Sequence, residues 1–125
     1  MPIDASLPYD DTNVLARILR GELPSKPVLE SEHSLAIHDI NPLAPIHVLV
    51  IPKGRYVSWD DFSARASDAE IVDFVRTIGE VARKTGASAQ GYRTLANTGK
   101  RGGQEIPHLH VHLFGGAPLG PMLAR

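Results

Sequence analysis

Three histidines occur at alternate positions near the end of the chain, in the segment His108–Gly116, which reads HLHVHLFGG. In an extended strand successive side chains point to opposite faces of the sheet. His108, His110 and His112 would therefore share one face, and the apolar residues between them would share the other. Imidazole can act as a nucleophile, a general base or a metal ligand near neutral pH. The segment predicts a strand with one face for chemistry and one face in the core.

A metal site is the first alternative for these histidines, because imidazole is a common zinc ligand. Residues i and i+4 of a strand lie ~13 Å apart, so at most two of the three rings can reach one ion at ~2.0 to 2.1 Å. A neighbouring strand could supply His47 or another ligand. The chain has no cysteine, which excludes a thiolate site and a cysteine nucleophile. Spacing alone leaves metal-bound and metal-free chemistry both open.

The composition bounds the class of protein and its partners. The chain has 125 residues, enough for one domain with one core, and its 42% hydrophobic and 22% charged content is ordinary for a soluble globular protein. A formal net charge of -1 gives no broad attraction to nucleic acid or anionic membrane, so we expect a small-molecule partner. The start of the sequence is acidic, and no apolar run reaches the ~18 residues that span a bilayer. We expect a cytoplasmic protein.

The order of apolar patterns predicts an α+β domain on a mainly antiparallel sheet of about five strands. The expected strands lie at 28–31, 34–40 and 45–53, in the stretch that starts at Tyr92, and at 108–116. The first two form a hairpin, and the third is nearly continuous in apolar residues, as expected for a strand buried on both faces.

Two helices are expected, one short and one long. The short N-terminal helix has Thr12 as its N-cap and Gly21 and Pro24 as stops. Its apolar face contains Val14, Leu15, Ile18 and Leu19. The long helix begins after Ser67 and stops at Gly86. Its apolar stripe contains Ile71, Val72, Phe74, Val75, Ile78 and Val81.

A glycine-rich segment, NTGKRGGQ, occupies residues 97–104 between the last two expected strands. Glycine pairs are common in tight turns, and a turn alone would explain Gly102 and Gly103. The segment immediately precedes the histidines, so it delivers its backbone amides and two basic residues to the same end of the sheet. That placement suits an anion.

Taken together, the motifs HDINPLAPIH (38–47), GGQ (102–104) and HLHVHL (108–113) resemble the histidine triad (HIT) family, in its nucleoside phosphoramidase branch. The resemblance covers nearly the whole chain; the first ten or so residues and residues 54–69 carry no strong signature. It implies a single domain over residues 1–125 with an irregular N-terminal segment at about 1–10. It also implies a homodimer whose sheet continues across both subunits, with the tail 117–125 near the partner's site.

The resemblance implies that His110 attacks the α-phosphorus of a purine nucleotide conjugate of AMP or GMP. The nucleotidyl-histidine that forms is then hydrolysed by water, and a nucleoside monophosphate leaves. His112 would contact the phosphoryl oxygens, while His108 and His47 would orient neighbouring groups; no metal or cofactor takes part. Two alternatives stay open: a dinucleoside polyphosphate hydrolase, and a nucleotide-binding interaction protein with vestigial catalysis.

Nucleotide contacts follow from the same resemblance. Asp39 matches the carboxylate that binds the ribose hydroxyls. The base pocket would comprise Val14, Leu15, Ile18, Ile37, His38 and Ile40, although a purely structural apolar face is the alternative. The phosphate loop would comprise Asn97, Gly103 and Gln104, continuing through Glu105 and Ile106 toward the histidines.

Two departures from the family pattern occur. Some bacterial relatives bind structural zinc through a Cys-x-x-Cys pair, and the matching positions here are Asn13 and Ala16, so that zinc site is not expected. Glu105 occupies the position of a serine that the phosphoramidase branch uses to help protonate the leaving group. The preference for leaving groups therefore cannot be transferred directly.

The Glu105 side chain must avoid repulsion from the substrate. A carboxylate ~4 Å from a phosphoryl oxygen is repelled by up to ~4 kcal/mol at an effective dielectric of 20. Lys100 or Arg101 could neutralise Glu105, the side chain could turn away, or bound nucleotide could keep it protonated as a general acid for the departing amine. We favour the third. The kcat for a poor amine leaving group should then fall as pH rises, and Glu105→Ser should flatten that fall. An unchanged pH profile in the variant would place proton delivery at His112 or water.

Overall fold

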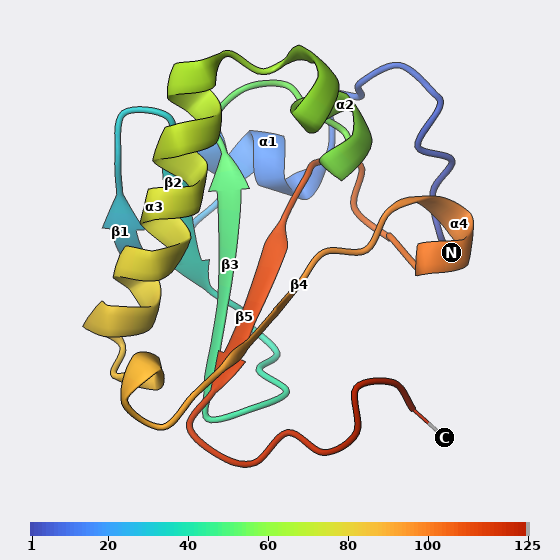
Figure 1. Ribbon diagram of the computed structural model, residues 1–125. Helices are drawn as coiled ribbons and strands as arrows, with labels where there is room; N and C mark the ends of the chain where they lie inside the picture. Colours follow the sequence, from blue (N-terminus) through green and yellow to red (C-terminus); the bar gives the residue numbers. More distant parts are fainter. Residues whose placement is uncertain (125) are drawn as a thin grey trace.

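The computed structural model describes residues 1–124 as one α+β unit (Figure 1). Five strands form one antiparallel sheet in the order β1-β2-β3-β5-β4, which confirms the predicted fold class. In chain order the elements are α1 (Val14–Leu19), β1 (Pro27–Glu30), β2 (Ser34–His38), β3 (Ile46–Pro52), α2 (Trp59–Arg65), α3 (Asp68–Lys84), a 3-10 turn (Ala87–Ala89), β4 (Arg93–Leu95), α4 (Gly99–Gly102) and β5 (Val111–Gly115).

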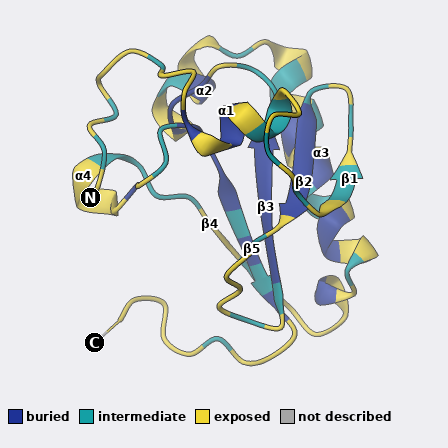
Figure 2. Cartoon of the chain, turned by 180° about the vertical axis from the view of Figure 1, so that it is seen from behind, coloured by how far each residue is buried: buried dark blue, intermediate teal, exposed yellow. Residues whose placement is uncertain are grey.

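The sheet has a helix on each face, α3 on one and α1 on the other (Figures 1 and 2). The side chains of the buried strand β3 alternate between two apolar clusters. Val48 and Val50 pack in the cluster that contains Phe74 of α3, whereas Leu49 and Ile51 pack in the cluster of α1. This two-sided burial is the pattern predicted for residues 45–53. The central strands are accordingly the most buried part of the molecule (Figure 2).

The long helix α3 begins and ends as predicted, but its apolar stripe is narrower. Ser67 caps it through a reciprocal capping box with Glu70, and Gly86 follows it in the left-handed conformation. Val72 and Val75, expected in the stripe, are 51% and 58% exposed. The prediction was wrong for these two because only the positions in line with Phe74 on a 3.6-residue period face the sheet.

The short helix α1 starts one residue later than predicted. Its N-cap is Asn13, whose side-chain oxygen accepts the backbone N–H of Ala16 at 2.9 Å. The Thr12 hydroxyl instead donates to Asp10 Oδ1 at 2.6 Å, so Thr12 belongs to the preceding turn. Asn13 thus orients the helix that forms one wall of the cleft described below.

Two short helices were not predicted. Helix α2 falls in the stretch that carried no signature, and a capping box between Ser58 and Asp61 begins it. Helix α4 is a single turn inside the glycine-rich segment; its first residue, Gly99, and the residue that follows it, Gly103, have φ of 66° and 78°. Residues with a Cβ rarely adopt such angles, which explains the glycines at these two positions.

Strand β5 is shorter than the predicted strand at 108–116. The ladder with β3 ends at the pair of Val50 and Val111, so His108 and His110 precede the regular strand. Pro52 lies where the ladder would continue, and it has no N–H to donate. The N–H of Leu109 bonds instead to the carbonyl of Tyr56 at 2.9 Å. The histidine segment therefore leaves the ladder at the point where the chemistry is expected.

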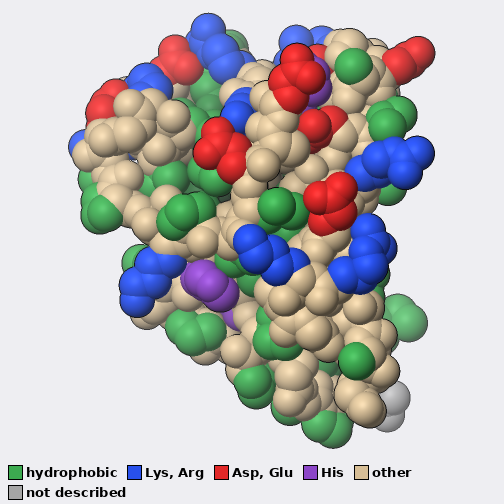
Figure 3. All heavy atoms as spheres, turned by 90° about the vertical axis from the view of Figure 1, so that its left-hand side faces the viewer, with side chains coloured by type: hydrophobic (Ala, Val, Ile, Leu, Met, Phe, Trp, Pro, Cys, Tyr) green, Lys and Arg blue, Asp and Glu red, His purple; other side chains and the backbone are tan. Residues whose placement is uncertain are grey.

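Two surface properties follow from the described residues. Within 1–124 no helix is long and apolar enough to cross a membrane. On the face shown in Figure 3, basic and acidic side chains are interspersed, so that face offers no extended cationic surface for a nucleic-acid backbone.

Candidate active site

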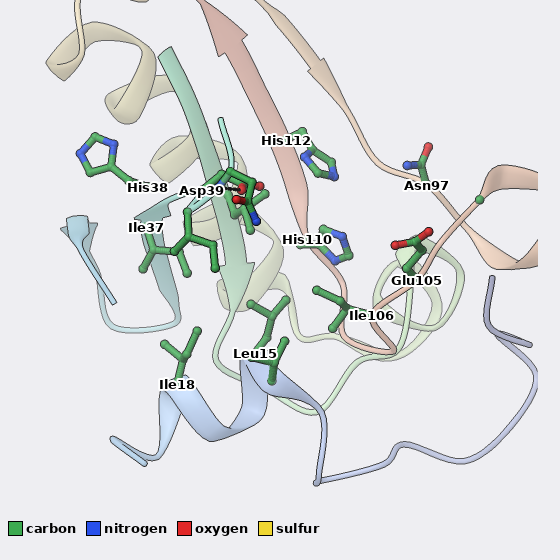
Figure 4. A pocket seen from close by; sticks show the side chains of 15 residues that line it. Leu15, Ile18, Ile37, His38, Asp39, Asn97, Glu105, Ile106, His110 and His112 are labelled. Carbon is green, nitrogen blue, oxygen red and sulfur yellow. Dashed lines mark hydrogen bonds between the residues drawn. The ribbon is translucent and has the colours of Figure 1, made fainter. Parts of the chain in front are cut away.

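A cleft of about 470 Å³ opens between α1, the end of β2, and the segment that leads into β5 (Figure 4). It brings together residues from widely separated parts of the chain. Every predicted nucleotide-binding residue lines it except Gln104. The lining residues are Val14, Leu15, Ile18, Ile37, His38, Asp39, Ile40, Asn41, Leu49, Asn97, Gly103, Glu105, Ile106, His110 and His112.

The cleft has one apolar wall and one polar wall. Leu15 and Ile18 of α1 and Ile37 of β2 form the apolar wall, whereas the two histidines lie opposite with Asn97 and Glu105 (Figure 4). His38 lies at the rim, exposed. The alternative of a purely structural face for α1 does not describe this helix, because its apolar residues also leave an open cleft. Such a division suits a flat ring on one side and an anion on the other.

His110 presents an unprotonated ring nitrogen to the cleft. Its Nδ1 lies 2.7 Å from the backbone carbonyl oxygen of His108, and a carbonyl can only accept, so Nδ1 carries the proton. In the neutral ring Nε2 then holds a lone pair. Burial lowers the pKa of His110 below its ordinary value, which keeps the ring neutral at pH 7. The geometry thus leaves His110 Nε2 as a nucleophile.

His112 is prepared for the opposite role, that of a donor. Leu43 N–H donates to His47 Nδ1 at 3.1 Å, so the proton of His47 is on Nε2, which lies 2.9 Å from His112 Nδ1. His112 Nδ1 therefore accepts, and its proton is on Nε2. Burial, with smaller contributions from His110 and His47, lowers the pKa of His112 to about 4. His112 is consequently a neutral N–H donor beside the nucleophile, with the two ring centroids 5.1 Å apart.

His47, which does not line the cleft, completes a chain of aligned rings. The centroid of its ring lies 4.2 Å from that of Phe114. Phe114 in turn stacks on His112, with an angle of 2° between the two ring planes. Burial lowers the pKa of His47, so it too is neutral. The Leu43 amide fixes the tautomer of His47, and His47 fixes that of His112.

Asp39 offers one carboxylate oxygen to the cleft. Its Oδ1 accepts the backbone N–H of Asn41 at 2.8 Å, and its Oδ2 lies 3.4 Å from His47 Nε2. The first contact orients the carboxylate at the end of β2. Since the stronger hydrogen bond of His47 goes to His112, Oδ2 retains acceptor capacity for a ligand hydroxyl.

The same three residues are the nearest approach to a metal site within residues 1–124. One ligand atom each from Asp39, His47 and His112 lies within 4.8 Å of the others. An ion there would need both facing imidazole nitrogens without protons. His47 would then carry its proton on Nδ1, where the Leu43 N–H already donates. The arrangement therefore fits a hydrogen-bonded histidine pair better than a metal site.

The glycine-rich loop is held in place by Gln104, which is the one predicted nucleotide-binding residue that does not line the cleft. Gln104 is buried; its Oε1 accepts the N–H of Gly99 at 3.0 Å, and its Nε2 donates to the carbonyl of Val57 at 2.6 Å. These bonds fix the loop so that Asn97 and Gly103 reach the cleft. Glu105, exposed at the cleft wall, forms no ion pair with Lys100 or Arg101 among the described residues.

His108 is buried behind the cleft and does not line it. Its Nε2 bonds to the carbonyl of Pro52 at 2.8 Å, and its Nδ1 lies 2.5 Å from the hydroxyl of Tyr9. The sequence analysis gave Tyr9 no role, and it also missed Asn41 and Leu49 among the lining residues. Asn41 is two residues after Asp39, and Leu49 belongs to the apolar pattern of β3, so the sequence carried a positional signal for both. Tyr9 carried none.

The HIT domain family model matches residues 20–119 of the chain. A HIT-like protein of 13.2 kDa from Azospirillum brasilense is 62% identical over 117 residues, which is 94% of this chain and 96% of that protein. The purine nucleoside phosphoramidase of Escherichia coli is 39% identical over 115 residues, which is 92% of this chain and 96% of the enzyme.

Solved structures of similar proteins share the fold. A HIT family hydrolase from Clostridium thermocellum superposes with a TM-score of 0.80 and 36% identity, covering 92% of this chain and 99% of that one. A histidine triad protein from Clostridium difficile superposes with a TM-score of 0.78 and 36% identity, covering 89% and 96%.

Proposed function

Because this chain belongs to the HIT domain family, we propose that it is a nucleotide hydrolase or transferase that cleaves the P–N bond of purine nucleoside phosphoramidates. A relative at 39% identity is named a purine nucleoside phosphoramidase, which supports this choice of bond. The observation that carries the proposal is that two neighbouring histidines at the cleft have opposite tautomers: His110 Nε2 holds a lone pair, and His112 Nε2 carries a proton. Binding alone needs no such pair of opposite tautomers.

The proposed reaction has two displacements at phosphorus. In the first, His110 Nε2 forms a bond to the α-phosphorus while the P–N bond breaks, and the departing amine takes the proton of the Glu105 carboxyl. The imidazole becomes cationic, and the carbonyl of His108 stabilises this charge through the proton on Nδ1. His112 Nε2–H donates to a phosphoryl oxygen throughout. In the second displacement water attacks phosphorus and gives a proton to the Glu105 carboxylate, the N–P bond breaks, and the nucleoside monophosphate leaves with His110 restored to neutrality.

A substrate panel tests the proposal. Adenosine and guanosine phosphoramidates with the same amine should both be cleaved, with release of the monophosphate and the free amine. A diadenosine polyphosphate should be a much poorer substrate. Faster cleavage of the diadenosine compound would favour the polyphosphate hydrolase, and binding of AMP without cleavage of any conjugate would favour the interaction protein.

We propose that Asp39 binds the ribose through Oδ2, its oxygen without a backbone partner. A ribose contact is made equally in the ground and transition states, so its loss weakens binding more than it slows chemistry. Asp39→Ala should raise KM about tenfold or more and change kcat much less. Steady-state kinetics with ribose and 2'-deoxyribose substrates measure this. If the native protein cleaves both sugars equally well, Asp39 does not bind the ribose hydroxyls.

We also propose a homodimer in which the sheets of two subunits are continuous and the tail at 117–125 approaches the partner's site; the last residue of this tail, Arg125, lies outside the described residues. The edge strand β4 is compatible with this, because Tyr92 and Leu95 expose apolar surface along it. A sedimentation measurement of the mass in solution tests the proposal, and a monomer at the concentrations that support activity would contradict it.

A further inference from the structure

Tyr9 lies in the segment before α1 and contacts the buried histidine His108. Its hydroxyl oxygen is 2.5 Å from His108 Nδ1, and the two rings meet edge-on at 5.5 Å between centroids and 69° between planes. The segment contains no helix or strand, yet it delivers this side chain to the rear of the site. The contact joins residues 99 positions apart in the chain.

The direction of this hydrogen bond follows from the other nitrogen of His108. The carbonyl of Pro52 can only accept, so His108 Nε2 carries the proton and Nδ1 is the acceptor. The Tyr9 hydroxyl therefore donates. Burial raises the pKa of Tyr9 and lowers that of His108 to about 4, so the phenol stays protonated and the imidazole stays neutral. Both ring nitrogens of His108 are thus satisfied only while Tyr9 is in place.

His108 in turn holds the nucleophile. Its backbone carbonyl accepts the Nδ1 proton of His110 at 2.7 Å, which is the bond that leaves Nε2 of His110 free for attack. The side chain of His108 has 0% exposure and is bonded at both nitrogens, so the backbone that carries this carbonyl is fixed on both sides. Loss of the hydrogen bond from Tyr9 to His108 Nδ1 would leave a buried acceptor unpaired, which is costly in free energy. The His108 ring would then move to find another donor.

The N-terminal segment is itself anchored near the same residues. The Arg55 guanidinium lies 5.3 Å over the Tyr9 ring and bonds to Asp11 at 2.8 Å. The N–H of Ile3 donates to the carbonyl of Gln104 at 2.7 Å, so the segment is also tied to the glycine-rich loop. These contacts hold Tyr9 from both sides without including it in the cleft lining.

We propose that Tyr9 is a positioning residue, which fixes the ring of His108 and through its carbonyl aims His110 Nε2 at the phosphorus. This inference rests on the proposed phosphoryl transfer. It assigns the N-terminal segment a place in catalysis although none of its residues lines the nucleotide cleft. Tyr9 acts on the rate of attack and not on nucleotide binding.

Tyr9→Phe tests this by removing only the hydroxyl and keeping the edge-on ring. We expect kcat to fall about tenfold with KM within about twofold. In a single-turnover experiment the rate constant of nucleotidyl-enzyme formation should fall about as much as kcat, while the concentration of sites that bind AMP stays that of the native protein. A merely structural role would instead lower the concentration of these sites, because fewer molecules would be folded. Asp4→Asn is the matched control: Asp4 accepts hydrogen bonds from Ser6 in the same segment and bonds to neither Tyr9 nor His108, so its kcat should match the native value.

An imidazole ¹⁵N spectrum separates failure of this inference from failure of the proposed function. In the native protein the spectrum should show His108 protonated at Nε2 and His110 protonated at Nδ1, and in Tyr9→Phe both signals should shift or broaden. Unchanged imidazole signals, or a kcat equal to that of Asp4→Asn, would overturn the role of Tyr9. If the native protein cleaves no nucleotide conjugate the proposed function fails, and the spectrum still decides whether Tyr9 controls the two histidines.

Discussion

Replacement of His110 by glycine is expected to lower turnover of a nucleoside phosphoramidate by at least about 10⁴-fold. The variant lacks the nitrogen that bonds to phosphorus, and the neighbouring ring of His112 presents a protonated nitrogen to the cleft. The apolar wall and Asp39 remain, so AMP should still bind. Single-turnover kinetics and calorimetric titration with AMP measure the two effects separately.

Two further measurements test the role of His110. Added imidazole should restore part of the activity, because the glycine leaves space for a free ring at the same place. In the native protein the acid limb of kcat/KM should lie below pH 6.5, since burial lowers the pKa of His110 and attack requires the neutral ring. Turnover by His110→Gly at a rate near that of the native protein would show that another group attacks phosphorus.

The second large effect is expected for His112→Phe, with kcat about 10² to 10³ lower. Phenylalanine keeps a ring that can stack on Phe114 but has no N–H for the phosphoryl oxygen. The donor matters more in the transition state, where charge on the phosphoryl oxygens is redistributed, so KM should change less than kcat. Rapid-quench measurement of the nucleotidyl-enzyme should show that its formation, and not nucleotide binding, is slowed.

His33→Phe is a suitable control for this substitution, because His33 lies in the turn between β1 and β2 and does not line the cleft. Its kcat should be that of the native protein. A kcat for His112→Phe within about threefold of the native value would mean that backbone amides of the glycine-rich loop supply the stabilisation instead.

Most of the fold could be predicted from local patterns. The alternation in β3 and the capping box of α3 involve neighbouring residues, so the sequence displays them directly. The Ser58 and Asp61 pair that begins α2 was a readable signal of the same kind, and it was overlooked. The end of the β3–β5 ladder could not be predicted in this way, because it depends on which residue lies opposite Pro52.

The residues of the site likewise fall into those that local sequence patterns predict and those that they do not. Residues in contiguous motifs, such as Asp39 and His110, reach the cleft as expected because the strands that they flank, β2 and β5, both pair with β3 in the sheet. The alternate histidines were expected to share one face, but His108 turns into the interior once the segment leaves the ladder. Gln104 supports the loop from inside, and Tyr9 reaches His108 from an irregular segment. Long-range hydrogen bonds fix these two roles, and no periodic pattern encodes them.

The central claim is that His110 Nε2 becomes bonded to the α-phosphorus. Rapid mixing of the native protein with a purine nucleoside phosphoramidate, followed by an alkaline quench and peptide mass spectrometry, tests it most directly. We expect one nucleoside monophosphoryl group on the peptide that contains His110, formed and lost at rates that match turnover, and absent in His110→Gly. Steady release of nucleoside monophosphate without this adduct, or with the adduct on another residue, would contradict the account.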